Sequence, residues 1–133
     1  MTLLDTNIFL RSIIPDDPKR AHRCTKLLEA VAEGRETAIV TPMVIAEIVW
    51  VLLGSYRLSK SSVIDAMRRI LNTAKLEVVE HSILLKSLEV FESHDIDFID
   101  AYHAAFMERR GITTVTSYDT DFDQIHGITR REP

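Results

Sequence analysis

The sequence has 133 residues, 46% of them hydrophobic, with four glycines and four prolines, and this composition excludes a disordered or low-complexity chain. A single cysteine, Cys24, excludes an internal disulfide and a zinc site built from cysteines. The formal net charge of −4 argues against a protein whose whole surface attracts nucleic acid.

The longest apolar run, residues 42–53, contains a glutamate and is shorter than the roughly 20 apolar residues that a membrane span needs. The sequence opens on Thr2-Leu3-Leu4 without a basic segment followed by an apolar one, so we expect no secretion signal and a cytoplasmic location. No linker or repeat interrupts the pattern. We therefore expect one domain over residues 1–133 and no membrane partner.

The first half of the chain alternates short strands with helices. Residues 2–4 are predicted to form a buried strand, and apolar residues continue from 8 to 14. Asp17-Pro18 caps and starts a helix that Gly34 closes. Residues 37–40 form a second predicted strand, and Thr41-Pro42 begins a helix that runs to about Leu53.

The second half repeats this alternation. Ser61 or Ser62 caps a helix to about Thr73, residues 76–79 form a strand, and residues 83–91 form a helix. Asp97 caps a helix that ends before Gly111, and residues 113–116 form a β-branched strand. Alternating strands and helices predict the α/β class, as a three-layer α/β/α sandwich with a central, mostly parallel sheet.

Two acids follow predicted strands. Asp5 comes after the first strand and Asp119 after the last, and ligands of α/β sheets bind beyond the carboxyl ends of the strands. Aspartate is also favoured at turns and caps for its local hydrogen bonds, so each acid taken alone also fits a structural interpretation.

Glu47 is the only charge in the helix from Pro42, which is apolar nearly all round. Such a helix is expected to be buried, and a buried carboxylate must be paired, protonated or bound to a metal. The alternative is a structural ion pair with an arginine or lysine.

Asp97 and Asp100 are three residues apart at the start of one helix. A cap lies just outside the helix, so we assign that position to Asp97 and leave Asp100 as the candidate ligand.

The convergence of Asp5, Glu47, Asp100 and Asp119 would require a cation, because each pair at about 5 Å repels by about 3 kcal/mol at an effective dielectric of 20. Oxygen ligands without cysteine select Mg²⁺ or Mn²⁺ over zinc. Two such ions would match the net charge of −4 and remove the objection to a nucleic-acid substrate. The histidines show no ligand spacing, although His103 lies on the same side of its helix as Asp100.

Four motifs in this order resemble PIN-domain ribonucleases, particularly VapC-type toxins. They are Asp5-Thr6-Asn7, the acid Glu47 in an apolar helix, Asp97-Phe98-Ile99-Asp100-Ala101, and the run from Ser117 through Tyr118-Asp119-Thr120-Asp121 to Phe122. Ser117 stands where the family often has threonine, and this keeps the hydroxyl.

The resemblance implies an acidic metal site formed by Asp5, Glu47, Asp100 and Asp119, with Asp121 as a possible sharer of the last position. It also implies that Thr6, Asn7 and Ser117 orient ligands or substrate, that the ion is Mg²⁺ or Mn²⁺, and that the chain is a homodimer. The substrate would be RNA, and the inhibitor would be a VapB-type antitoxin with a segment that occupies the site.

The reaction expected is hydrolysis of RNA phosphodiester bonds by one or two ions. A receiver-like phospho-acceptor needs a lysine after a late strand, and the last lysine is Lys86. A phosphatase with an aspartate nucleophile needs an acid where Asn7 stands. An RNA-binding module without activity is a further alternative, although all four acids are present. No G-x-S-x-G or phosphate-binding glycine loop occurs.

Overall fold

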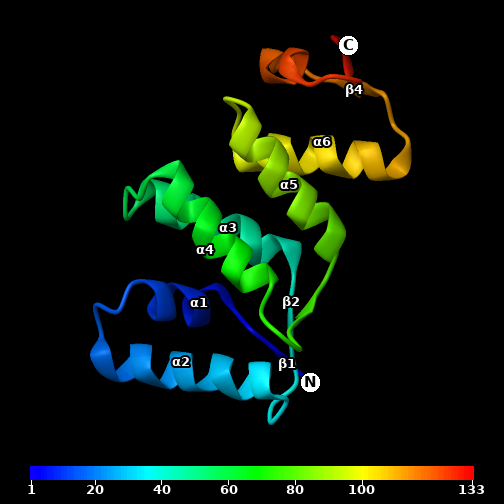
Figure 1. Ribbon diagram of the computed structural model, residues 1–133. Helices are drawn as coiled ribbons and strands as arrows, with labels where there is room; N and C mark the ends of the chain where they lie inside the picture. Colours follow the sequence, from blue (N-terminus) through cyan, green and yellow to red (C-terminus); the bar gives the residue numbers. More distant parts are fainter. The chain divides into compact units, whose positions relative to one another are not determined.

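A computed structural model describes all residues from 1 to 133, and these divide into two compact units, Met1–Glu80 and His81–Pro133. Both units combine helices with parallel strands (Figure 1). The predicted α/β class with parallel pairing is therefore confirmed. No helix is both long and apolar enough to cross a lipid bilayer.

The first unit contains a three-stranded parallel sheet in the order β1-β2-β3. Its elements in chain order are β1 (Thr2–Leu3), α1 (Thr6–Ile13), α2 (Pro18–Glu33), β2 (Ala38–Val40), α3 (Pro42–Gly54), α4 (Lys60–Leu71) and β3 (Glu77–Val78). Helix α1 packs against α2 and α3, and α3 packs against α4 (Figure 1). The fully buried core of this unit includes Leu4, Phe9, Val40, Ile45, Leu52 and Met67.

Several helix ends follow from the capping residues that the sequence predicts. The Asp17 carboxylate accepts a hydrogen bond from the backbone N–H of Arg20, and Pro18 occupies the first turn of α2. Gly34 ends α2 with φ of 81°, the left-handed conformation that glycine adopts without a steric penalty. Thr41 occupies the N-cap position of α3, but its side chain makes no capping hydrogen bond.

Two predictions for this unit are wrong in detail. Strand β1 is exposed at both of its residues, and only Leu4 beyond it is buried, because β1 lies at an edge of the three-stranded sheet. Helix α4 starts two or three residues earlier than predicted, because the Ser59 hydroxyl accepts a hydrogen bond from the N–H of Ser62 and so forms the cap.

The second unit consists of two packed helices and a two-stranded parallel sheet. Its elements are α5 (His81–Ser93), α6 (Phe98–Arg110), β4 (Thr114–Thr116), the 3₁₀ helix η1 (Thr120–Gln124) and β5 (Thr129–Arg131). Phe91 of α5 and Phe98 of α6 meet edge to face, with ring centroids 5.8 Å apart. Gly111 ends α6 in the left-handed conformation, as predicted. Neither η1 nor β5 is predicted from the sequence.

Candidate metal centre

The start of helix α6 holds the one buried carboxylate of the chain, that of Asp100. Asp97 is the N-cap of α6, and its Oδ1 accepts a hydrogen bond from the backbone N–H of Asp100 at 2.9 Å. The predicted role of Asp97 as the cap of this helix is therefore found in the structure. The Oδ2 atom of Asp100 is buried without a hydrogen-bond partner, an arrangement that favours a bound cation.

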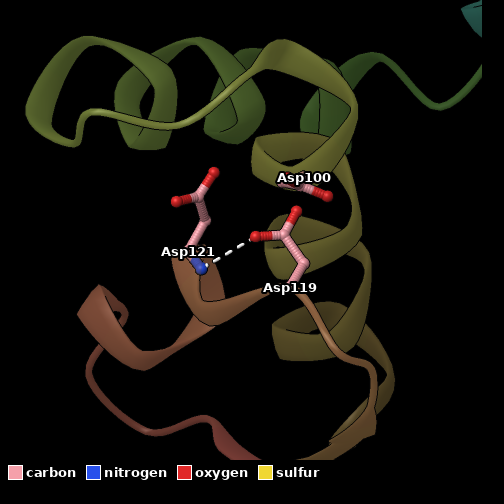
Figure 2. Close-up of side chains that lie close together, drawn as sticks. All are labelled: Asp100, Asp119 and Asp121. Atoms are coloured by element: carbon pink, nitrogen blue, oxygen red, sulfur yellow. Dashed lines mark hydrogen bonds between the residues drawn. The ribbon is translucent and has the colours of Figure 1, made fainter.

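Two further carboxylates come to Asp100 from the start of η1, where Asp119 is the N-cap and Asp121 lies in the first turn. One carboxylate oxygen from each of the three residues lies within 4.8 Å of the others. Figure 2 shows the side chain of Asp100 on α6 close to those of Asp119 and Asp121 at η1. Asp121 therefore lies in the same cluster as Asp119 and Asp100.

The segment between β4 and η1 is held by local hydrogen bonds. The backbone N–H of Asp119 donates to the Ser117 hydroxyl, and the N–H of Asp121 donates to Oδ1 of Asp119, each at 2.9 Å (Figure 2). Asp119 is therefore both the cap of η1 and a member of the cluster. The Ser117 hydroxyl therefore helps to fix the backbone position of Asp119.

Arg130 of β5 holds this segment in place, and this role was not predicted from the sequence. Its guanidinium donates to the Ser117 carbonyl at 2.9 Å and pairs with Asp123 at 3.0 Å. Phe122 anchors η1 in the core of the unit. The paired Arg130-Arg131 after the acidic run was the available signal, but it gained meaning only once β5 was known to pair with β4.

The electrostatics of the cluster favour protonation or a counter-ion. Burial raises the pKa of Asp100 to about 7, and the charge of Asp97, a hydrogen bond with Asp119 and the charges of Asp119 and Asp121 act in the same direction. The pKa of Asp121 is also raised, first by desolvation and then by the charge of Asp119. The three acids cannot all ionise at low cost without a cation.

Asp5 belongs to the first unit, where it follows β1 and occupies the N-cap position of α1. Its side chain makes no capping hydrogen bond, so a purely structural explanation as a cap does not account for the carboxylate. Thr6 beside it is buried, and Asn7 is exposed in the first turn of the helix.

Glu47 also belongs to the first unit, and the prediction that it is buried is wrong. Helix α3 buries one face, made of Val44, Ile45, Ile48, Val49 and Leu52, and leaves Met43, Glu47 and Trp50 exposed along the opposite stripe. These exposed positions are three or four residues apart, so they lie on one side of the helix. The high hydrophobicity of the whole helix gave no sign of this exposed side in the sequence. No ion pair involves Glu47, so the structural salt bridge is absent.

The structure thus assembles Asp100, Asp119 and Asp121 in the second unit and supplies Asp97 as the cap. The meeting of Asp5 and Glu47 with these acids stays a prediction. His103 is exposed on α6, and its ring lies 5.9 Å from that of Tyr102.

Together, parallel strands and a cluster of oxygen ligands define an α/β protein with a candidate site for a hard cation. The family model for the PIN domain matches residues 2–128, and the chain belongs to the PIN domain family. The resemblance to PIN-domain proteins that the four sequence motifs indicated is therefore confirmed.

Two known proteins are similar to this chain over most of its length. A VapC ribonuclease of Aquifex aeolicus strain VF5 is 21% identical over 125 residues, covering 94% of this chain and 92% of that protein. The crystal structure of Mycobacterium tuberculosis VapC20, described as a toxin that cleaves the sarcin-ricin loop, is 19% identical. The structural match covers 93% of this chain and 94% of the VapC20 chain, and its TM-score is 0.41.

Proposed function

We propose that this chain is a metal-dependent endoribonuclease of the VapC type, the toxin of a type II toxin-antitoxin pair. The observation that carries the proposal is the buried, unpartnered Oδ2 of Asp100 within a cluster of three carboxylates, in a chain that belongs to the PIN domain family. The similarity to a VapC ribonuclease supports RNA as the substrate.

The residues fit a hard divalent cation. The donors are carboxylate oxygens, and neither cysteine nor histidine takes part, which favours Mg²⁺ or Mn²⁺ over zinc. Asp100, Asp119 and Asp121 would hold the ion, and we propose that Asp5 and Glu47 complete the site. When bound, the ion would supply Lewis-acid stabilisation of negative charge on the phosphate oxygens.

Two side chains next to the cluster would hold the carboxylates in place. Asp97 fixes the backbone from which Asp100 projects, and Ser117 fixes that of Asp119. In hydrolysis, water adds to phosphorus, the bond from phosphorus to the 3′ oxygen breaks, and that oxygen takes a proton. The products would carry a 5′-phosphate and a 3′-hydroxyl. Attack by the RNA's own 2′-hydroxyl would instead leave a 2′,3′-cyclic phosphate, so product end groups distinguish the two routes.

The decisive experiment incubates purified, partner-free protein with total cellular RNA plus Mg²⁺, Mn²⁺ or EDTA, with Asp119→Asn and the exposed control Asp65→Asn alongside. We expect cleavage that requires metal, disappears in Asp119→Asn and persists in Asp65→Asn. No cleavage of any RNA by folded, metal-loaded protein would exclude the ribonuclease and favour an RNA-binding module.

A VapB-type antitoxin and a homodimer belong to the same proposal. An antitoxin segment that occupies the acidic site would protect RNA in this assay, and light scattering on the purified chain would report the dimer.

A further inference from the structure

A small cleft separates helices α1 and α2 in the first unit, one turn away from Asp5. Its volume is about 210 Å³. The lining residues come from only these two helices and are Asn7, Ile8, Arg11, Arg20, Arg23 and Cys24. Because Asn7 is the second residue of α1, a ligand in this cleft would lie beside the turn that carries Asp5.

The N-terminal half of α2, which lines one side of the cleft, is rich in basic residues although the chain has a net charge of −4. Residues 18–28 contain four cations, Lys19, Arg20, Arg23 and Lys26, and no carboxylate. The first turn of α2 has no acidic residue, although the positive end of a helix dipole favours acids there and disfavours cations. Arg20 pairs with the cap Asp17 and Lys26 pairs with Glu29, but Lys19 and Arg23 have no ion pair. Pairing along the helix therefore accounts for only part of this charge, and an anionic ligand would account for the rest.

The arginines at the cleft are only partly neutralised. Asp17 is the one acid that pairs with them, 3.9 Å from Arg11 and 3.5 Å from Arg20. Arg23 has no ion pair. Three guanidinium groups paired with one carboxylate leave a charge of +2 among these four groups, in a form suited to two-pronged bonds with phosphate.

The cleft also has an apolar part, because Ile8 and Cys24 line it together with the arginines. Apolar surface, planar guanidinium groups for stacking and an amide for hydrogen bonds are the features that bind an unstacked base in single-stranded RNA. A peptide of acidic residues alone would match the positive charge but would bring no planar ring to the apolar surface.

We propose that the cleft between α1 and α2 binds one nucleotide of the RNA substrate, with Arg20 and Arg23 on the phosphates and Ile8 against the base. This inference rests on the proposed function. It names a substrate-binding surface that lies outside the acidic cluster.

The test measures binding by fluorescence anisotropy in EDTA, with a fluorescein-labelled RNA of twelve uridines as the probe. Arg23→Gln is compared with Arg35→Gln, an equal loss of charge at the far end of α2, where Arg35 pairs with Glu33. The double variant Arg20→Gln/Arg23→Gln is compared with Arg35→Gln/Arg109→Gln. All these side chains are exposed, so folding is expected to persist.

We expect the Kd to rise about fivefold for Arg23→Gln and about twentyfold for the double variant, while each control changes less than about twofold. The slope of log affinity against log salt should fall by about 0.7 for each lost phosphate contact. With metal present, kcat/KM for RNA cleavage should fall in parallel with the affinity.

Equal binding by the cleft variants and their controls would overturn the proposal. Oligoglutamate of the same length binding more tightly than the RNA, with the same dependence on Arg23, would also overturn it in favour of an acidic protein partner. Because binding is measured without metal, a chain that binds the RNA through the cleft but never cleaves would refute the ribonuclease alone.

Discussion

Asp100 combines burial, an unpartnered oxygen and three acidic neighbours, and these properties conflict unless something positive binds. A side chain selected only for stability would not stand there, because a neutral residue of the same shape avoids the desolvation cost. The geometry therefore identifies Asp100 as the residue where function opposes stability.

Asp100→Asn should separate these two effects. We expect RNA cleavage to fall by at least about a hundredfold through loss of a ligand, and the metal-free protein to become more resistant to urea at pH 8. The exposed Asp65→Asn serves as the control for both measurements. An Asp100→Asn protein that is less stable without metal would contradict the argument from burial.

The stability of the metal-free protein should also depend on pH through Asp100. Its pKa is about 7 in the folded chain against an ordinary value of 3.8. Below the ordinary value both states hold the proton and stability is fully present. As pH rises toward 7 only the folded state keeps it, so stability falls, and it levels off once the folded state has also lost the proton.

Urea unfolding in EDTA at pH 5 and pH 8 would measure this loss, and Asp100→Asn would report the part due to other groups. Equal pH dependence in the two proteins would show that Asp100 has no raised pKa. Added Mg²⁺ should restore stability at pH 8 and have little effect at pH 5, where Asp100 holds its proton.

Residue-level prediction succeeded where a local rule determines the outcome and failed where packing does. The cap rule separated Asp97 from Asp100 without a structure, because a cap must stand just outside its helix. Overall hydrophobicity misplaced Glu47, because the composition of a helix does not reveal which stripe its neighbours cover. Whether Asp5 and Glu47 share the site with Asp100 was not derivable from either rule.

At the scale of the element, helix α6 serves as the support for the cluster. If Asp97 acts only as a cap, Asp97→Ala should cost about 1 kcal/mol of stability and also lower activity by loosening the start of the helix. Asp97→Asn and Asp97→Ser keep a capping oxygen and should retain most of both. Loss of metal binding in the well-folded Asn variant, measured by calorimetry with Mn²⁺, would instead make Asp97 a ligand.

Element prediction was strongest for the long helices, where periodicity and caps agree, as in α2 between Asp17 and Gly34. It missed η1 and β5 near the end of the chain. A 3₁₀ turn has no amphipathic repeat that a sequence pattern could reveal. Strand β5 forms by pairing with β4, and a short polar run such as Thr129–Arg131 does not predict a strand by itself. Because β5 was not predicted, the role of Arg130 was not predicted either.

At the scale of the whole molecule, the proposed site requires acids from both units to act on one ion. Asp5→Asn and Asp119→Asn should each weaken Mn²⁺ binding, and in the double variant the two losses should fall short of their sum, since a site already broken has little left to lose. Titration calorimetry on the three variants and the parent chain would give the coupling. Glu36→Gln, an exposed change in the first unit, is the matched control for Asp5→Asn. Unchanged Mn²⁺ affinity in Asp5→Asn, beside a clear loss in Asp119→Asn, would confine the metal site to the second unit and leave Asp5 as a residue of the turn before α1.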